Sequence, residues 1–260
     1  MLYDANACFG MDMVNHECVN HENFIVMEKV DIARDVKELI AYMDRAGIDK
    51  ANVWYRSMYD YDPYTGNRRI VEAIRGYEDR LSASFTLLPA ITDKDFENDK
   101  LFPLMKENNV RTLHAFPLQN RYMLSAVTMG EQLEEISDRK IPLYLSPMNG
   151  WEMIYNVLKE FPLLTVVLYN IGWWPSARYV YPLLKAYKNV YFETGDFSMI
   201  KGYEDVTNRF GSERMLFGTN FPTNAMAGSI CCLEYARISD KDKENIAYGN
   251  ITRLLSGVIL

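Results

Sequence analysis

The sequence predicts a single (β/α)8 barrel, and three observations support this prediction. Short apolar runs rich in β-branched and aromatic residues alternate with longer amphipathic stretches. Eight such pairs follow one another, and no Ser/Pro-rich linker, low-complexity tract or charge block interrupts them. The length of 260 residues and the hydrophobic content of 48% suit one large α/β domain, which we expect to span residues 1–260. The alternative is a doubly wound open sheet, which is disfavoured because no Gly-rich phosphate loop follows a strand.

The eight expected strands are short runs bounded by turn residues. In chain order they are LYDANAC, KANVWYR, RLSASFTLLP, VRTLHAF, IPLYLS, LTVVLYN, NVYFETG and RMLFGTN. Strand one should hold residues 3–8 and strand eight residues 214–219.

The helices are expected where apolar residues recur at three- and four-residue spacing. They lie near 31–46, 66–76, 94–108, 130–139, 151–161, 176–187, 203–210 and 240–255. Asp31 can cap the first helix, and Gly47 supplies the left-handed residue that favours a helix end.

Composition limits the classes of function. The net charge of −7, with scattered Lys and Arg, offers no basic face for a nucleic acid. No run of about eighteen apolar residues occurs, and no basic region precedes an apolar stretch at the N-terminus, so we expect a cytoplasmic protein without a membrane partner. The four cysteines are too few and too clustered for a disulfide framework, and we expect reduced thiols.

In a barrel of this kind the functional site lies at the C-terminal ends of the strands. These ends are polar although the strands are apolar, and they carry Asn6, Cys8, Tyr55, Arg56, Thr86, Thr112, His114, Ser146, Asn170, Glu193, Asp196 and Asn220. On strand one, Asp4, Asn6 and Cys8 occupy alternate positions and are expected to share one face.

Five motifs between residues 3 and 255 carry a family resemblance. "YDANACFG" is similar to an Asp-x-His-x-His opening, "RTLHAFPLQ" to a Lys-Leu-His-Pro strand, and "FPLLTVVLYNIGW" to Phe-Pro-x-Leu-x-x-Val-Leu-x-His-x-Gly-Gly. "ERMLFGTNFP" and "ENIAYGNITRLL" are similar to Phe-Gly-Ser-Asp-Phe-Pro and Tyr-Gly-Asn-x-x-Arg-Leu-Leu. The chain thus resembles the amidohydrolase superfamily, in its amidohydrolase-related branch with the aminocarboxymuconate-semialdehyde decarboxylase-like enzymes and several lactonases. The resemblance implies a TIM barrel of the metal-dependent-hydrolase type.

The resemblance also implies that every usual metal position is changed. Asn6 and Cys8 replace two histidines, Thr112 a lysine or another acid-base ligand, Ser146 and Asn170 two further histidines, and Asn220 an aspartate. Neutral amide and hydroxyl oxygens hold zinc poorly. We therefore expect a degenerate site without a metal or other cofactor. We expect instead a neutral hydrogen-bonded cluster of Asn6, Asn170 and Asn220, with Asp4 or Ser146 at its edge and a water or small polar ligand at its centre.

The remaining ionisable groups are the candidates for catalysis. His114 is either a base at the mouth or a satisfied structural residue. Glu193 and Asp196 can divide acid and base roles if burial separates their pKa values. Cys8 is a nucleophile beside His114 or inert packing.

Two further features of the sequence each have two interpretations. "HECVNHE" places His16 and His21 on the first loop, either as a substitute metal site or as a solvated segment. Aromatic residues near the mouth suit a pocket for a flat or carbohydrate-like ligand, although some will be packing: Tyr55, Tyr59, Tyr61, Tyr64, Tyr169, Trp173, Trp174 and Phe197.

These observations leave two classes of function. The first is a metal-independent hydrolase or lyase for a small organic acid, ester or amide, with His114, Glu193 and Asp196 as catalytic residues. Its binding residues would be Asp4, Asn6, Cys8, Arg56, Ser146, Asn170, Trp173 and Asn220. The second is a non-catalytic descendant that binds a small molecule or a partner protein at the same place. The fold alone does not separate the two classes of function. The sequence does not fix the oligomeric state, and a homo-oligomer is one possibility.

Overall fold

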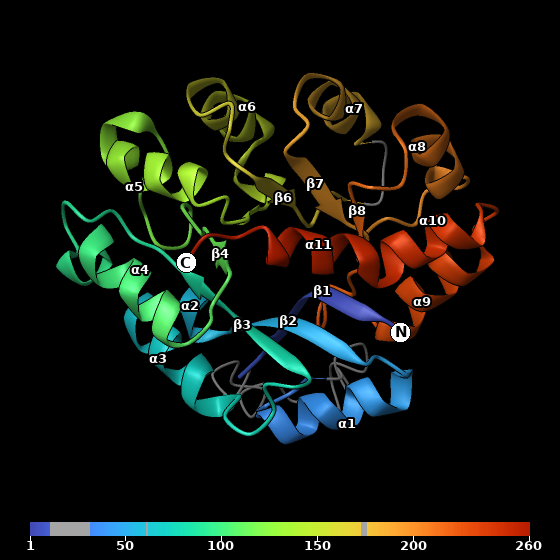
Figure 1. Cartoon of the computed structure of the whole chain (residues 1–260), viewed down its shortest axis with the longest axis horizontal. Coiled ribbons are helices and arrows are strands. Elements are labelled where there is room, and N and C mark those ends of the chain that lie inside the picture. Colours follow the sequence, from blue (N-terminus) through green and yellow to red (C-terminus); the bar gives the residue numbers. More distant parts are fainter. Residues whose placement is uncertain (11–31, 61, 173–175) are drawn as a thin grey trace, which may run out of the picture.

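Eight parallel strands form the centre of the molecule. The structure is a computed structural model and describes residues 1–10, 32–60, 62–172 and 176–260. The strands pair in sequence order, and they are β1 (Tyr3–Phe9), β2 (Lys50–Tyr55), β3 (Leu81–Thr86), β4 (Thr112–His114), β5 (Leu143–Leu145), β6 (Val166–Leu168), β7 (Val190–Glu193) and β8 (Met215–Leu216). Helices follow the strands and surround them (Figure 1), so the predicted (β/α)8 barrel is confirmed and the open sheet is not formed.

β1 and β8 close the barrel through separate contacts instead of a regular ladder. Ala5 N donates to Phe217 O at 2.8 Å. The Asp4 carboxyl then accepts hydrogen bonds from Thr219 N at 3.0 Å and from the Thr219 hydroxyl at 2.5 Å. Because a side chain takes the place of the strand partner here, β8 is shorter than the expected 214–219.

A β-bulge in β1 changes which way its side chains point. The register against β2 shifts between Asp4 and Ala7. Bulges break the two-residue alternation of side chains. The expectation that Asp4, Asn6 and Cys8 share one face is therefore wrong, and each of the three has different partners.

The surrounding helices cover the strands. They are α1 (Val36–Ala46), α2 (Ser57–Asp60), α3 (Pro63–Ala73), α4 (Asn98–Glu107), α5 (Ala126–Asp138), α6 (Trp151–Glu160), α7 (Ala177–Ala186), α8 (Gly202–Phe210), α9 (Met226–Tyr235), α10 (Asp240–Glu244) and α11 (Asn250–Ser256). None of the helices within the described ranges is long and apolar enough to cross a membrane.

The first helix differs from the expectation at its start. Asp35 caps α1 by accepting from Glu38 N at 2.9 Å, and the expected cap Asp31 lies outside the described residues. Gly47 ends α1 with a φ of 75°, the left-handed conformation that glycine adopts without strain, as expected.

The expected helix 240–255 is three elements, α10, a π-helical turn (Asn245–Gly249) and α11. The wide turn lets Ile246 O accept from Phe217 N at 2.9 Å, directly after β8. Asn250, which follows the turn, is buried and donates from its amide to Ser212 O and Met215 O, each at 2.7 Å. The helices α2 and α9 were not expected, because each is short or lacks a clear apolar stripe.

Candidate functional site

The strand ends carry most of the predicted site residues into the interior of the mouth, the C-terminal end of the barrel. Asp4, Asn6, His114 and Glu193 are buried there. Several expected residues lie outside the described part of the chain: His16, His21, Tyr61, Trp173 and Trp174.

Asn6 holds a fixed orientation in the barrel interior. Its Oδ1 accepts from Trp54 Nε1 at 3.0 Å and lies 3.3 Å from His114 Nε2. Indole nitrogen is a donor only, so Oδ1 must face Trp54, and the amide nitrogen points elsewhere. Asn6 Nδ2 is buried and has no hydrogen-bond partner among the described residues.

His114 is engaged at both ring nitrogens. Its Nδ1 lies 2.7 Å from Ser84 Oγ, and its ring stacks on Tyr144 with 4.5 Å between centroids. Because Asn6 Oδ1 can only accept, Nε2 carries the proton and Nδ1 accepts from Ser84. Burial lowers the pKa of His114 to about 3, so the ring is neutral. This arrangement matches the satisfied structural histidine better than a base, since no lone pair remains available.

Glu193 ends β7 with its carboxyl buried. Oε2 accepts from Gly195 N at 2.7 Å, while Oε1 has no hydrogen-bond partner in the described ranges. A Cβ on Gly218 would lie 2.1 Å from Oε2, so glycine is needed there for close approach. Burial raises the pKa of Glu193 well above its usual value, and the charges of Asp196 and Asp4 raise it further, whereas the backbone N–H groups of Gly195 and Asn170 oppose the rise. Burial therefore favours the protonated form of Glu193.

The other two acids have specific partners. Asp196, three residues after Glu193, accepts a hydrogen bond from the Asn224 amide. Burial raises the pKa of Asp4 to about 6, although its hydrogen bonds from Thr219 and Asn6 N oppose the rise. Asp4 thus lies at the barrel closure and also adds negative charge near Glu193.

Asn170 and Asn220 form an amide pair after β6 and β8. Asn220 Nδ2 donates to Asn170 Oδ1. Both residues have left-handed backbones, with φ of 53° and 51°, a conformation that asparagine tolerates better than most residues. The predicted three-asparagine cluster is thus found only as this pair, because Asn6 bonds to Trp54 and His114.

Cys8 does not pair with His114. Its thiol donates to Phe9 O at 3.6 Å, and burial raises its pKa, so the thiol is neutral and suits packing better than nucleophilic attack. Ser146 is buried and accepts from Met148 N at 3.2 Å, which caps the short turn after β5.

Arg56 is the cation of the mouth. Its Nε donates to both carboxylate oxygens of Asp60, at 3.0 and 3.1 Å, and its Cζ lies 4.6 Å from the Tyr59 ring centre. Its terminal guanidinium nitrogens make no hydrogen bond to the described residues. A guanidinium with free terminal nitrogens can bind a carboxylate.

An aromatic group lines the same end of the barrel. Trp54 packs 5.1 Å from Phe116, and Tyr59 meets Phe116 edge to face at 5.3 Å. Of the other expected aromatics, Tyr169 is buried against His114, whereas Tyr64 is exposed beneath Arg68. Only part of the expected aromatic set therefore surrounds the mouth.

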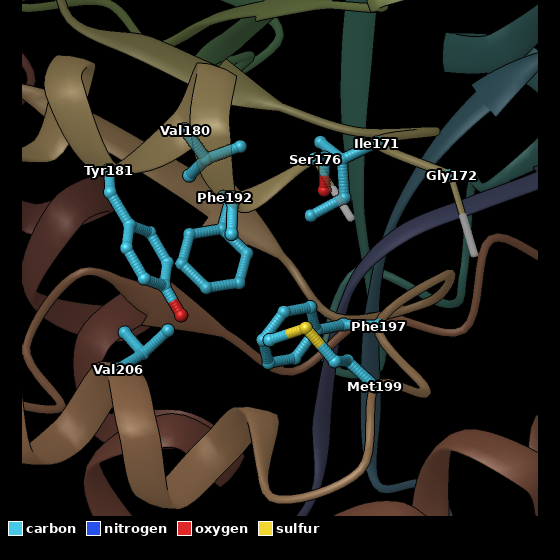
Figure 2. A pocket seen from close by; sticks show the side chains of 10 residues that line it. Ile171, Gly172, Ser176, Val180, Tyr181, Phe192, Phe197, Met199 and Val206 are labelled. Atoms are coloured by element: carbon cyan, nitrogen blue, oxygen red, sulfur yellow. The ribbon is translucent and has the colours of Figure 1, made fainter. Parts of the chain in front are cut away.

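A small apolar cavity lies beside Phe197 and Met199, in the segment that follows β7 (Figure 2). Val180, Phe192, Phe197 and Val206 line it, and it encloses about 10 Å³. That volume is too small for an organic substrate, and the lining is mainly apolar, with the hydroxyls of Ser176 and of Tyr181, which bonds to Asp205, as the exceptions. The cavity is a packing gap between β7, α7 and α8 and not the substrate site.

The donor set does not fit the divalent metal that the family resemblance implies. Asn6 Oδ1 already faces two N–H groups, Asn170 Oδ1 accepts from Asn220, and the Cys8 thiol is held neutral. A metal of this type needs anionic or imidazole ligands. In the described ranges no group of three or more His, Cys, Asp or Glu side chains could hold a metal ion.

Sequence reasoning missed Trp54 and Ser84, which orient Asn6 and His114. Trp54 lies two residues after Asn52 on β2, and Ser84 lies two residues after Ser82 on β3; Asn52 and Ser82 bond to each other in the interior. Two polar residues two positions apart on an otherwise apolar strand were a usable signal, since such residues face the same side.

Comparison with known proteins supports the family resemblance. An amidohydrolase family model matches residues 133–257, which include the motifs of strands six and eight and the closing motif. No curated protein sequence matches the chain.

Solved structures share the whole barrel. A dihydroxybenzoic acid decarboxylase from Polaromonas sp. JS666, solved with manganese and the inhibitor 2-nitroresorcinol, has a TM-score of 0.76 at 14% identity, with 98% of this chain and 96% of that chain covered. A 5-carboxyvanillate decarboxylase from Sphingomonas paucimobilis has 0.73 at 14%, with 99% of each chain covered. A 4-oxalomesaconate hydratase from Rhodopseudomonas palustris has 0.68 at 15%, with 99% and 96% covered. At these identities the likeness establishes the fold.

Proposed function

We propose that this (β/α)8 barrel, whose residues 133–257 match an amidohydrolase family model, is a hydrolase or lyase for a small organic carboxylate. It acts at the mouth and without the metal that the family resemblance implies. The observation that supports the proposal is the position of the Glu193 carboxyl, which is fully buried at the end of β7, a place that raises its pKa, and whose Oε1 has no hydrogen-bond partner among the described residues.

Glu193 serves as the general acid. Hydrolysis, hydration and decarboxylation each need a proton delivered to a leaving group or to a carbon centre. A carboxyl whose pKa is raised by burial keeps its proton near pH 7 and can donate it as negative charge develops. Asp196, three residues later, accepts a hydrogen bond from the Asn224 amide, which fixes its carboxylate beside Glu193 in the same loop.

Arg56 supplies the recognition of an anionic substrate. Its guanidinium lies over Tyr59, whose ring packs against Phe116, which in turn packs against Trp54, and a cation beside flat rings suits a planar carboxylate. The three similar structures described above are two decarboxylases, of dihydroxybenzoic acid and 5-carboxyvanillate, and a 4-oxalomesaconate hydratase. The acidic net charge of −7 further favours a small molecule over a nucleic acid.

Turnover by chelator-treated protein tests the proposal. Protein dialysed against a chelator is incubated with 2,6-dihydroxybenzoate and other small carboxylates, and products are measured by chromatography. We expect turnover that the chelator leaves unchanged and that Glu193→Gln lowers by about 100-fold or more. Glu134→Gln, on the exposed face of α5, is the matched control and should retain activity.

The same experiment separates the enzyme from a non-catalytic binder. Calorimetric titration with 2-nitroresorcinol reports occupancy of the mouth independently of chemistry. Binding without turnover of any carboxylate would contradict the enzyme and support the non-catalytic descendant.

A further inference from the structure

The loop that follows β4 holds the short helix α2, which follows β2. Gln119 Nε2 donates to the Tyr59 hydroxyl at 2.9 Å, and Asn120 Nδ2 donates to Met58 O at 3.1 Å. The two contacts differ in kind, because Asn120 binds the helix backbone whereas Gln119 binds a side chain. Both segments leave the C-terminal ends of their strands, so the contacts join two parts of the mouth.

The Tyr59 side chain is thereby held at several points. Its hydroxyl meets Gln119, its ring meets Phe116 edge to face with 5.3 Å between centroids, and Arg56 Cζ lies 4.6 Å from the ring centre. Phe116 is itself buried. A tyrosine side chain has only two rotatable bonds to its ring, so these contacts fix the surface on which the guanidinium lies.

The Arg56 guanidinium is also fixed at one edge. Its single Nε–H is shared by both carboxylate oxygens of Asp60, at 3.0 and 3.1 Å, and its backbone N donates to Phe9 O at 2.9 Å. The two terminal nitrogens make no hydrogen bond to any residue that the structure describes, and 25% of the side chain is exposed. These two nitrogens form the edge of the guanidinium that can bind both oxygens of one carboxylate.

The Asp60 carboxylate makes the orientation of this edge decisive. Its charge balances that of Arg56, so attraction at a distance contributes little to the binding of an anion. Affinity then depends on two short, well-aligned N–H···O bonds at contact, and a guanidinium that turns out of its plane cannot form both.

We propose that Gln119 is a positioning residue: through Tyr59 it orients the Arg56 guanidinium so that the terminal nitrogens bind a substrate carboxylate with two parallel hydrogen bonds. The inference rests on the proposed function, and it makes the mouth selective for a carboxylate over a neutral group of the same shape. Preorganisation of this kind lowers the entropy that a long arginine side chain loses on binding.

Calorimetric titration of the purified protein with 2,6-dihydroxybenzoate and with its neutral isostere 2,6-dihydroxybenzamide tests the inference. We expect the wild type to prefer the carboxylate by about 10-fold or more, and Arg56→Gln to remove the preference. Gln119→Leu and Tyr59→Phe should each weaken carboxylate binding by about 3- to 10-fold and leave amide binding unchanged. The double variant should lose no more than either single variant, because both changes break the same contact.

Asn120→Ala is the matched control in the same loop. It removes the hydrogen bond to the α2 backbone but keeps Gln119, so the preference for the carboxylate should stay within about twofold of wild type. Circular dichroism establishes that each variant is folded.

The outcomes separate the inference from the proposed function. An equal loss of preference in Asn120→Ala, additive losses in the double variant, or no preference in the folded wild type would overturn the inference. A preference that depends on Gln119, without turnover of any carboxylate, would sustain the inference and contradict only the enzyme. Turnover with a carboxylate preference that Gln119→Leu leaves unchanged would contradict only the inference.

Discussion

His114 makes the stability of the folded chain depend on pH. Its pKa is lowered from 6.5 to about 3 because burial disfavours the imidazolium. The stability that comes from keeping the ring neutral is therefore present above pH 6.5 and is lost as the pH falls toward 3. Each pH unit in that range removes up to about 1.4 kcal/mol of unfolding free energy. We predict that His114→Gln, which cannot be protonated, flattens this dependence.

Urea denaturation of both proteins at a series of pH values measures the effect. Asp4 acts in the opposite direction, because its pKa is raised to about 6 and its contribution is lost as the pH rises through that value. Asp4 is present in both proteins, so the difference between the two curves isolates His114. Parallel curves from pH 7 to pH 4 would show that the imidazole is protonated without cost.

The sequence predicted which side chains at the strand ends are polar, but it did not predict which residues they contact. The polar character of Asn6, His114 and Glu193 was readable from the alternation along strands. Their contacts were not, because the bulge at Asp4 redirects β1 and because Trp54 reaches Asn6 across the sheet. Tertiary contacts of this kind have no signature in a single strand.

Among the elements, the turn between α10 and α11 stabilises the short last strand. Asn250 bonds two buried carbonyl oxygens, of Ser212 and Met215, and its own Oδ1 accepts from Arg253 at 2.9 Å. We predict that Asn250→Ala lowers the unfolding free energy by about 2–4 kcal/mol, because it leaves both carbonyls without this donor. Chemical denaturation measures the loss.

A control in the same turn separates this effect from a general loss of polarity. Asn245, at the start of the turn, makes one part-buried hydrogen bond, to the Ser212 hydroxyl at 3.1 Å. Asn245→Ala should cost about 1 kcal/mol or less. Equal losses in the two variants would mean that Asn250 does not hold β8.

The sequence predicted helices and strands correctly wherever the spacing of apolar residues was regular. The helices at 151–160 and 202–210 match their expected stretches closely, because both carry a clear apolar face. The segment 240–255 was expected as one helix, since a π-helical turn keeps helical spacing while it changes the hydrogen bonds. The structural role of this turn is the hydrogen bond that Ile246 O accepts from Phe217 N, a tertiary contact that the sequence alone does not reveal.

At the scale of the whole molecule, metal binding depends on side chains that come from several strands of the barrel. Closure of the sheet brings the ends of β1, β5, β6 and β8 to one mouth, where the family resemblance places metal ligands at positions that here hold Asn6, Cys8, Ser146, Asn170 and Asn220. Because one ligand is of little use without the others, we predict no stoichiometric metal in the purified wild type and none in Asn220→Asp. The combined variant Asn6→His, Cys8→His, Ser146→His, Asn170→His and Asn220→Asp should bind about one zinc per chain. Elemental analysis measures the metal, and circular dichroism establishes that each variant is folded. A folded five-fold variant that holds no zinc would mean that these positions do not form one site, whereas stoichiometric metal in the wild type would contradict the metal-independent function itself.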